Sequence, residues 1–264
     1  MNYELLFLLL LLGGFVGVMA GLLGIGGGLI VVPALLYLLP QANISTDVVM
    51  HIALATSLAS IIITSGSSAY NHLKLGNVNI YVIKWLLPGV ILGGFIGSYV
   101  TELIPSEMLP NVFGSIVLFL ALQMLISVKS TTVRAMPGEF VTSCSGCIIG
   151  IISTLAGIGG GSLTVPYLNR YGVEMRKAVG SSSVCGCVIA LSGMTGFIWH
   201  GIGVAHLPDY SVGYVYTPAL IAIVSTSVFT TKIGARWATR LPTAQLKKVF
   251  ALFLLFIAGR MLLS

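Results

Sequence analysis

The chain has 264 residues, of which 56% are hydrophobic and 8% carry a charged side chain. A soluble domain has about 25% charged residues, so this composition excludes a water-soluble globular fold and predicts an integral membrane protein. The net charge of +6 comes from Lys and Arg residues clustered between apolar stretches, which indicates membrane topology rather than nucleic-acid binding. We therefore expect a multi-pass protein of the plasma or inner membrane, in contact with the lipid bilayer along most of its length.

The first half of the chain contains one long apolar stretch and three shorter ones. Residues 3–39 are too long for a single crossing, which needs about 20 residues, and the sequence GIGGG at residues 24–28 interrupts them. We expect this stretch to be retained, because it lacks the basic start and the cleavage site of a signal peptide. The next apolar segments are residues 48–71, 80–100 and 109–128.

The second half follows the same plan. Residues 138–168 are apolar and are interrupted by GIGGG at residues 157–161, which lies 133 residues after the first copy, and a Val-Pro pair follows both copies at the same spacing. Further apolar segments are residues 178–199, 211–233 and 249–263. This internal repeat divides the chain into two related halves, residues 1–133 and 134–264.

The positions of the basic residues indicate that the two halves are inverted. In the first half the basic loops follow the second and fourth apolar segments (Lys74 and residues 129–134), whereas in the second half they follow the first and third (residues 170–177 and 236–240). Positively charged loops stay cytoplasmic. Because inversion needs an odd number of crossings per half, we expect each glycine-broken stretch to enter and return on one side.

The predicted fold class is an all-α integral membrane protein of two inverted repeats. Each repeat consists of a glycine-broken helical hairpin plus three transmembrane helices, which makes about eight hydrophobic segments in all. Both termini are then predicted to lie outside. The alternative is eight plain spans whose charges depart from the positive-inside rule, which has exceptions.

Two broken helices that meet inside a membrane predict an anion-binding site. The helix that restarts after each glycine cluster has free N–H groups and a positive dipole end, and glycine lets a ligand approach the backbone. Neutral Ser, Thr and Asn side chains in the following segments could donate further hydrogen bonds, although such residues also serve as small packing groups between membrane helices. The predicted substrate-binding residues are Gly26, Gly27, Gly28, Thr56, Ser57, Asn71, Gly159, Gly160, Gly161, Ser181, Ser182 and Ser183.

Few ionisable residues lie inside the apolar segments. His51 is the deepest and is a candidate for a proton role, whereas Lys84 and Lys232 lie close enough to segment ends to reach the interface. The acids lie at segment ends or in loops, which disfavours a cation pump and is compatible with anion movement. Four cysteines, Cys144, Cys147, Cys185 and Cys187, are interpreted as packing residues, with a metal or sulfur-relay role as the alternative.

The doubled motif Gly-Ile-Gly-Gly-Gly-x-x-x-Val-Pro resembles the TauE/SafE family of sulfite-exporter-type permeases. The stretch GARWATRLP at residues 234–242, followed by LKKVF at residues 246–250, is similar to the C-terminal signature of that family. The resemblance covers nearly the whole chain. It implies a transporter for sulfite or a related organosulfur anion, and the sulfur chemistry of the substrate is implied by the resemblance alone.

The leading hypothesis is a secondary transporter, acting as an exporter, that carries a small anion by alternating access at a midplane site between the halves. An anion channel and a non-transporting membrane subunit or sensor are the alternatives. The sequence contains no nucleotide-binding, zinc-protease or serine-protease constellation, so we predict no enzymatic activity, no cofactor and no metal site. The expected partners are a small anionic substrate and the bilayer, with no nucleic acid, and apolar spans of this kind are compatible with a homodimer.

Overall fold

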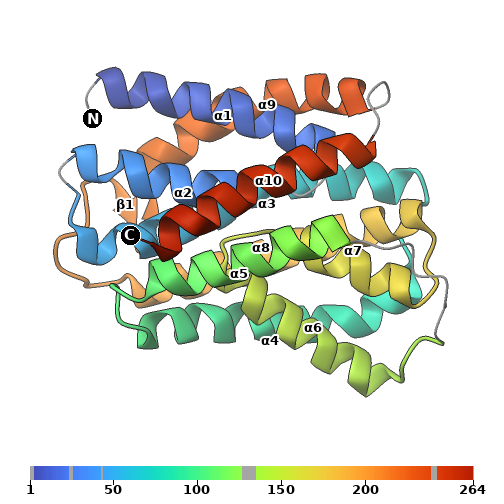
Figure 1. The fold of residues 1–264 in the computed structure, drawn as a ribbon. Helices are drawn as coiled ribbons and strands as arrows, with labels where there is room; N and C mark the ends of the chain where they lie inside the picture. Colours follow the sequence, from blue (N-terminus) through green and yellow to red (C-terminus); the bar gives the residue numbers. More distant parts are fainter. Residues whose placement is uncertain (1–2, 24–25, 43, 127–134, 239–242, 264) are drawn as a thin grey trace.

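The computed structural model describes the chain except for residues 1–2, 24–25, 43, 127–134, 239–242 and 264. The first half forms a series of helices that run back and forth along one axis (Figure 1). They are α1 (Tyr3–Leu23), α2 (Gly28–Leu38), a 3-10 turn at Pro40–Ala42, α3 (Thr46–Lys74), α4 (Ile80–Leu103) and α5 (Leu109–Ile126).

The second half repeats this order. It contains α6 (Glu139–Leu155), α7 (Gly161–Arg170), α8 (Met175–His200), α9 (Thr217–Ala238) and α10 (Thr243–Leu262), with the short strands β1 (Ser211–Val212) and β2 (Val215–Tyr216) before α9. The strands pair antiparallel, with Ser211 opposite Tyr216. The predicted apolar segment 211–233 therefore starts with a β-hairpin, because Gly213 takes a positive φ of 55° and turns the chain.

The helical, membrane-type architecture agrees with the prediction. By length and composition, five helices among the described residues could cross a membrane, namely α1, α3, α4, α8 and α9. The central one is α3, whose side chains are mostly buried inside the protein, whereas α1 and α9 expose many apolar side chains. Such exposed apolar surface is expected where a helix faces lipid.

The helix is broken at both glycine clusters. Gly26 and Gly27 have φ values of 79° and 75°, and Gly157 and Gly160 have φ values of 57° and 66°. These left-handed conformations are accessible to glycine at little cost, which is why the breaks occur there. The chain reverses at each break, so that α2 returns alongside α1 and α7 returns toward the start of α6 (Figure 1). Gly24 and Ile25 lie outside the described residues.

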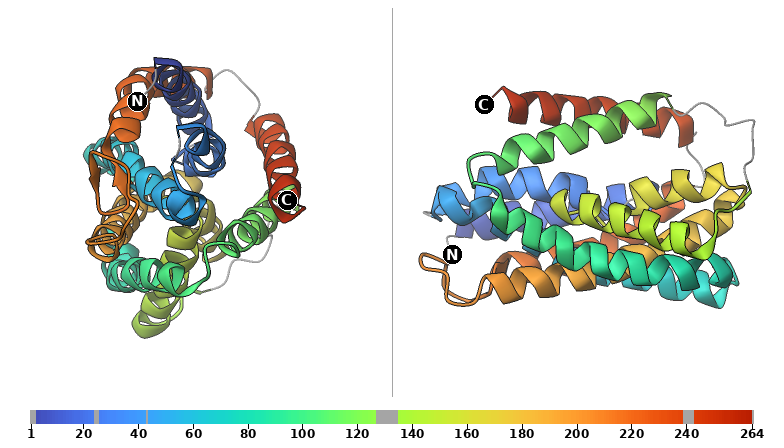
Figure 2. Two further views of the ribbon diagram at one scale, coloured as in Figure 1. Left: turned by 90° about the vertical axis from the view of Figure 1, so that its left-hand side faces the viewer. Right: turned by 90° about the horizontal axis from the view of Figure 1, so that it is seen from below.

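Four helices of each half pack on a helix of the other half, and the fifth packs within its own half. The pairs are α1 with α9, α4 with α6, α3 with α8, and α5 with α10, while α2 lies on α3 and α7 lies on α8. The first helix of each half therefore pairs with the fourth helix of the other half, which gives the pairs α1–α9 and α6–α4. Figure 2 shows α5 and α10 as a separate layer on one side of the others.

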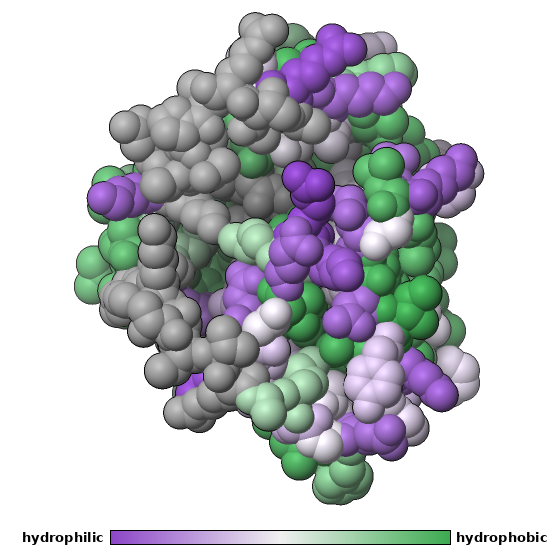
Figure 3. Space-filling model, turned by 90° about the vertical axis from the view of Figure 1, so that its right-hand side faces the viewer, coloured by the Kyte–Doolittle hydropathy of each residue, from purple (hydrophilic) through white to green (hydrophobic). Residues whose placement is uncertain are grey.

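Charged residues are distributed unequally between the two ends of the helices. The α3–α4 and α7–α8 turns lie at one end and both termini lie at the other (Figures 1 and 2). The former end carries Lys74, Arg170, Arg176 and Lys177, and its hydrophilic surface is visible in Figure 3. The opposite end carries the acidic residues of the α4–α5 and α8–β1 connections. We call the end with the α3–α4 and α7–α8 turns the basic end. The predicted basic residues Lys129, Arg134 and Arg240 lie outside the described residues.

Glycines bring α4 and α6 into backbone contact. A Cβ atom added to Gly93 would lie 2.2 Å from the carbonyl oxygen of Cys147, and one added to Gly89 would lie 1.8 Å from that of Ser143. Apolar lipid tails compete with apolar side chains, so close packing of small residues is what holds membrane helices together. This interface therefore depends on the absence of side chains at these positions.

We predict that Gly93→Ala destabilises the protein by about 1–3 kcal/mol, because the added methyl group forces α4 away from α6. The matched control is Gly259→Ala in α10, since a Cβ atom there would meet nothing within 4 Å. The thermal unfolding midpoints of the two variants, purified in the same detergent, provide the measurement. Equal midpoints would show that the α4–α6 contact does not limit stability.

Candidate functional site

The two bends lie directly against each other. A Cβ atom added to Gly28 would lie 2.3 Å from the carbonyl oxygen of Gly157, so the backbones of the two halves are in contact there. A Cβ atom added to Gly159 would lie 2.8 Å from the side chain of Ile61 in α3, and one added to Gly186 in α8 would lie 2.2 Å from the carbonyl oxygen of Gly159. Ile61 and Gly186 lie near the middle of their helices, so the bends meet about halfway along the molecule.

Each bend presents the start of a helix whose first amide groups have no partner among the residues that the structure describes. Gly27 and Gly160 are the N-cap residues of α2 and α7, and no side chain caps either helix. The first amides with a bonding partner in α7 belong to Leu163 and Thr164, which donate to the carbonyl oxygen of Gly160. Within the described part of the chain, the preceding amides of α7 remain free, as do the equivalent ones of α2. Unpaired N–H groups and the helix dipole make such a position favourable for an anion.

Helix α3 holds the bends together through predicted site residues. The Ser57 hydroxyl donates a hydrogen bond of 2.8 Å to the carbonyl oxygen of Gly157, and its Oγ lies 3.1 Å from the position of a Cβ on Gly28. Thr56 is fully buried, and its Oγ1 accepts a bond of 3.1 Å from the amide of Tyr216. In this conformation Ser57 joins one half to the other, and Thr56 anchors the β-hairpin.

The remaining predicted side chains lie closer to the basic end. Ser181 and Ser182 are buried and form hydrogen bonds with backbone groups. The Ser183 hydroxyl lies 3.0 Å from that of Ser68, which links α8 to α3. Asn71 is exposed near the end of α3. The structure thus brings the predicted glycines and Ser57 together and places Ser181, Ser182, Ser183 and Asn71 beyond them along the same two helices.

Buried hydroxyl groups beside the second bend were not predicted; those of Ser153, Thr154, Ser162 and Thr164 have no hydrogen-bond partner among the described residues. Ser153, at the end of α6, and Thr164, in the first turn of α7, are both 0% exposed, and their hydroxyls have no hydrogen-bond partner. Their oxygens lie 3.3 Å and 3.6 Å from the position of a Cβ on Gly160. A buried hydroxyl without a partner costs about 1–3 kcal/mol, so a ligand or water that accepts these bonds would be stabilising. Ser65 is a further missed residue; its Oγ lies 3.5 Å and 3.3 Å from Cβ positions on Gly26 and Gly159.

A second polar cluster lies at the end opposite the basic one. The imidazole Nε2 of His51 lies 3.7 Å from a carboxylate oxygen of Glu102, and the hydroxyl of Tyr214 donates to both carboxylate oxygens at 3.2 Å. The rings of His51 and Tyr214 stack with centroids 4.9 Å apart. Burial and the neighbouring carboxylate raise the pKa of Tyr214, which keeps its hydroxyl protonated as a donor. The carboxylate of Glu102 is therefore the acidic group that contacts His51, for which a proton role is predicted. The sequence predicts the acids at segment ends or in loops, and Glu102 lies in the last turn of α4.

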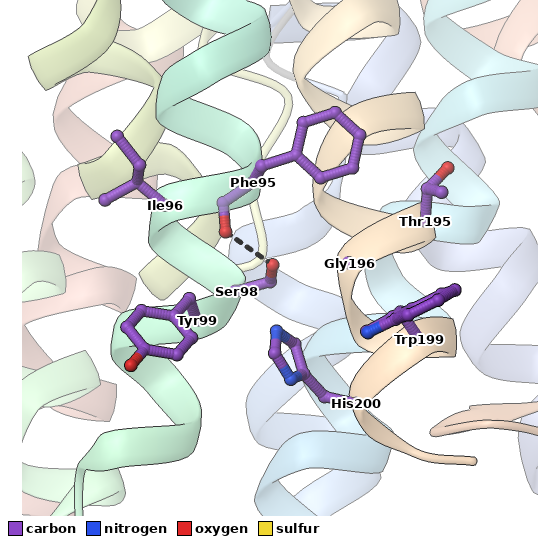
Figure 4. Close-up of a pocket in the computed structure, with 8 residues that line it drawn as sticks. All are labelled: Phe95, Ile96, Ser98, Tyr99, Thr195, Gly196, Trp199 and His200. Carbon is purple, nitrogen blue, oxygen red and sulfur yellow. Dashed lines mark hydrogen bonds between the residues drawn. The ribbon is translucent and has the colours of Figure 1, made fainter.

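Other features of the molecule lie away from the bends. A groove between α4 and α8 is lined mainly by apolar residues, among them Phe95, Tyr99 and Trp199, together with His200 (Figure 4). The four cysteines carry free thiols. Among the residues that the structure describes, no group of three or more His, Cys, Asp or Glu side chains is suited to a metal ion.

Comparison with known proteins links the chain to one family. The family model described as "Sulfite exporter TauE/SafE" matches residues 9–261. A "Probable membrane transporter protein" from Haemophilus influenzae is 41% identical over 263 residues, which cover 99% of this chain and 100% of that relative. Relatives with the same description from Bacillus subtilis and Methanocaldococcus jannaschii are 27% and 30% identical and cover 97% and 88% of this chain, at 96% and 86% of their own lengths. No solved structure matches.

We predict that Ser57→Ala lowers stability by about 1–3 kcal/mol, because it leaves the buried Gly157 carbonyl oxygen without its donor. The control is Ser60→Ala, whose hydroxyl donates to a carbonyl three residues earlier in the same helix. Loss of that local bond leaves the contact between the halves intact. Unfolding midpoints in detergent compare the two, and a larger loss for Ser60→Ala would contradict the role given to Ser57.

Proposed function

The chain belongs to the sulfite exporter TauE/SafE family, and from this premise we propose that it is a secondary transporter that exports a small anion. Its family and the descriptions of its relatives identify a membrane transporter. The proposed substrate is sulfite or a related sulfur oxyanion, and the family description supports that choice. The proposed site is the place where the two bends meet.

The observation that carries the proposal is the pair of opposed, glycine-opened helix starts. Backbone that is not helical survives at membrane depth only where protein or a water-filled cavity satisfies it. Among the described residues, no partner is found for the first amides of α2 and α7, while the carbonyl of Gly157 accepts a hydrogen bond from Ser57. The donors at the bends are therefore available to a ligand that accepts hydrogen bonds. An anion is such a ligand. Neutral donors also hold an anion loosely enough to release it.

Alternating access between inverted repeats is the proposed mechanism. The reversed course of the helices in the two halves supports inversion (Figure 1). The helix pairing supports inversion as well. The first helix of each half packs on the fourth helix of the other half, α1 on α9 and α6 on α4. In such transporters a central site is opened to each side in turn by movement of one bundle against another. The close contact of Gly28 with Gly157 then corresponds to a closed conformation.

Export needs no coupling ion in this scheme. A negative-inside membrane potential drives a monovalent anion outward with about 2.3 kcal/mol per 100 mV. The positive-inside rule places the basic end in the cytoplasm and both termini outside. The anion would then enter from the basic end, which attracts it.

We predict that the purified protein in liposomes moves sulfite, thiosulfate or sulfoacetate with saturation and trans-stimulation, and that Gly160→Ala reduces this flux at least tenfold. The added methyl group would lie 2.5 Å from Cδ1 of Ile189 and would force a positive φ on alanine. The control is Gly76→Ala, which has the same strain at φ 68° but open space around it. Flux without saturation or trans-stimulation would indicate a channel, and absence of flux for every anion would refute transport.

We predict that epitope tags at both termini are reached by antibody in intact spheroplasts, whereas a tag inserted at Gly76 in the α3–α4 turn is reached only after permeabilisation. The distribution of Lys and Arg determines this orientation. Immunofluorescence of the three tagged proteins provides the measurement. The opposite pattern would reverse the proposed orientation, and termini on opposite sides would refute inversion of the repeats.

A further inference from the structure

The two bends share their glycines but differ in the side chains around them. Gly27 and Gly160 are equivalent positions, 133 residues apart, and both are left-handed N-caps. A Cβ atom on Gly27 would meet the side chains of Val16 and Ala20, at 2.5 Å and 3.7 Å. The first bend therefore has apolar side chains around its N-cap residue, Gly27.

The second bend has hydroxyl groups at the equivalent point. At the repeat offset of 133 residues, Ser153 corresponds to Ala20 and Thr164 corresponds to Val31. Ala20 is 9% exposed and Val31 is 0% exposed, so these positions are buried in both halves. The same location in the fold thus holds two hydroxyls in one repeat and two hydrocarbon side chains in the other. Ser65 lies against both bends and does not distinguish them.

The hydroxyls of the second bend are placed for a ligand and lack another partner. Both Ser153 and Thr164 are fully buried, neither forms a hydrogen bond, and both lie within 3.6 Å of the Cβ position of Gly160, beside the free amides of α7. Serine and threonine in helices commonly donate to their own backbone, so these unbonded hydroxyls, with that of Ser162 in the first turn of α7 also unbonded, are an unusual group. Two hydroxyls and two amides together offer four donors and no fixed charge.

A tyrosine hydroxyl extends this polar surface toward the basic end. Tyr167 lies three residues after Thr164 and therefore on the same side of α7, and its buried hydroxyl also has no partner. Its ring contacts that of Tyr171, with centroids 5.1 Å apart. Tyr171 lines a pocket at the basic end together with Lys177. Unpartnered donors thus run from the second bend toward the end that would face the cytoplasm.

We infer that a small oxyanion binds at the second bend alone, on the hydroxyls of Ser153 and Thr164 and the first amides of α7, and that the first bend is its closed apolar partner. This inference rests on the proposed function. Ile189 of α8 lies against the same point and would have to move for the anion to enter. The site is therefore asymmetric within a symmetric scaffold.

The repeat itself supplies the test. The variant Ser153→Ala/Thr164→Val gives the second bend the side chains of the first, and Ala20→Ser/Val31→Thr gives the first bend the hydroxyls of the second. Binding of sulfite to each purified protein is measured by isothermal titration calorimetry, and sulfite flux is measured in liposomes. We expect the first variant to bind at least tenfold more weakly, since a hydrogen bond to a charged group is worth about tenfold or more. The second variant should stay within twofold of wild type.

The outcomes separate the inference from the proposed function. Unchanged affinity in Ser153→Ala/Thr164→Val, with flux intact, overturns the inference and leaves transport standing. A gain of affinity or of a second bound anion in Ala20→Ser/Val31→Thr also overturns it. Wild-type binding that depends on both hydroxyls, without any flux, supports the inference and refutes transport; absence of both binding and flux refutes both. If the double variant does not fold, Thr164→Val against Thr164→Ser decides, because only the latter keeps the hydroxyl and should keep the affinity.

Discussion

The structure depends on one constraint, which is that backbone exposed by a broken helix must find partners where water is scarce. An unpaired amide or carbonyl group in apolar surroundings costs several kcal/mol, and the chain contains two such breaks. Their carbonyls are placed against α3 and α8, where Ser57 bonds to Gly157 and Gly186 leaves room for Gly159. These two helices are central because they supply the surroundings that the bends require. What they leave unsatisfied among the described residues is a set of donors, and this imbalance is the basis of the proposal that the ligand is an anion.

Packing through glycine determines which parts of the molecule can move as units. Gly13 and Gly17 of α1 contact the backbone of α9, while Gly89 and Gly93 of α4 contact that of α6. Each of these tight pairs takes one helix from each repeat. On the proposed mechanism, the bodies that move would therefore be these mixed pairs, on either side of α3 and α8, rather than the sequence repeats. A central site opened to one side and then the other requires relative movement of the pairs, and the bends lie between them.

Much of the fold could be predicted from the sequence because glycine, charge and hydrophobic length act locally. The breaks at Gly27 and Gly160 follow from the cost of glycine in a helix and its access to positive φ. The side chains of the site were harder to predict, since a hydroxyl in a membrane helix has the same sequence appearance whether it packs, bonds to its own backbone or faces a ligand. Ser57 turned out to bond across the halves, whereas Ser153 and Thr164, which no local pattern singles out, lack any partner. The contact of His51 with Glu102 joins two helices, and no spacing in the sequence encodes it.

The asymmetry of the bends has a physical reason that follows from the inferred inversion of the repeats. Two opposed bends in contact would place two equivalent anion sites within a few ångströms of each other, and two like charges at such a distance repel strongly in surroundings of low dielectric constant. A protein with hydroxyls at both bends would therefore bind a second anion only against the repulsion of the first. Valine and alanine at the first bend remove that competition, while its glycines preserve the backbone shape that the second bend packs against. Symmetry is needed by the scaffold, because it relates the two directions of opening; the ligand needs a single set of donors. On this argument, selection would preserve the glycines of both halves for shape and the hydroxyls of one half for binding.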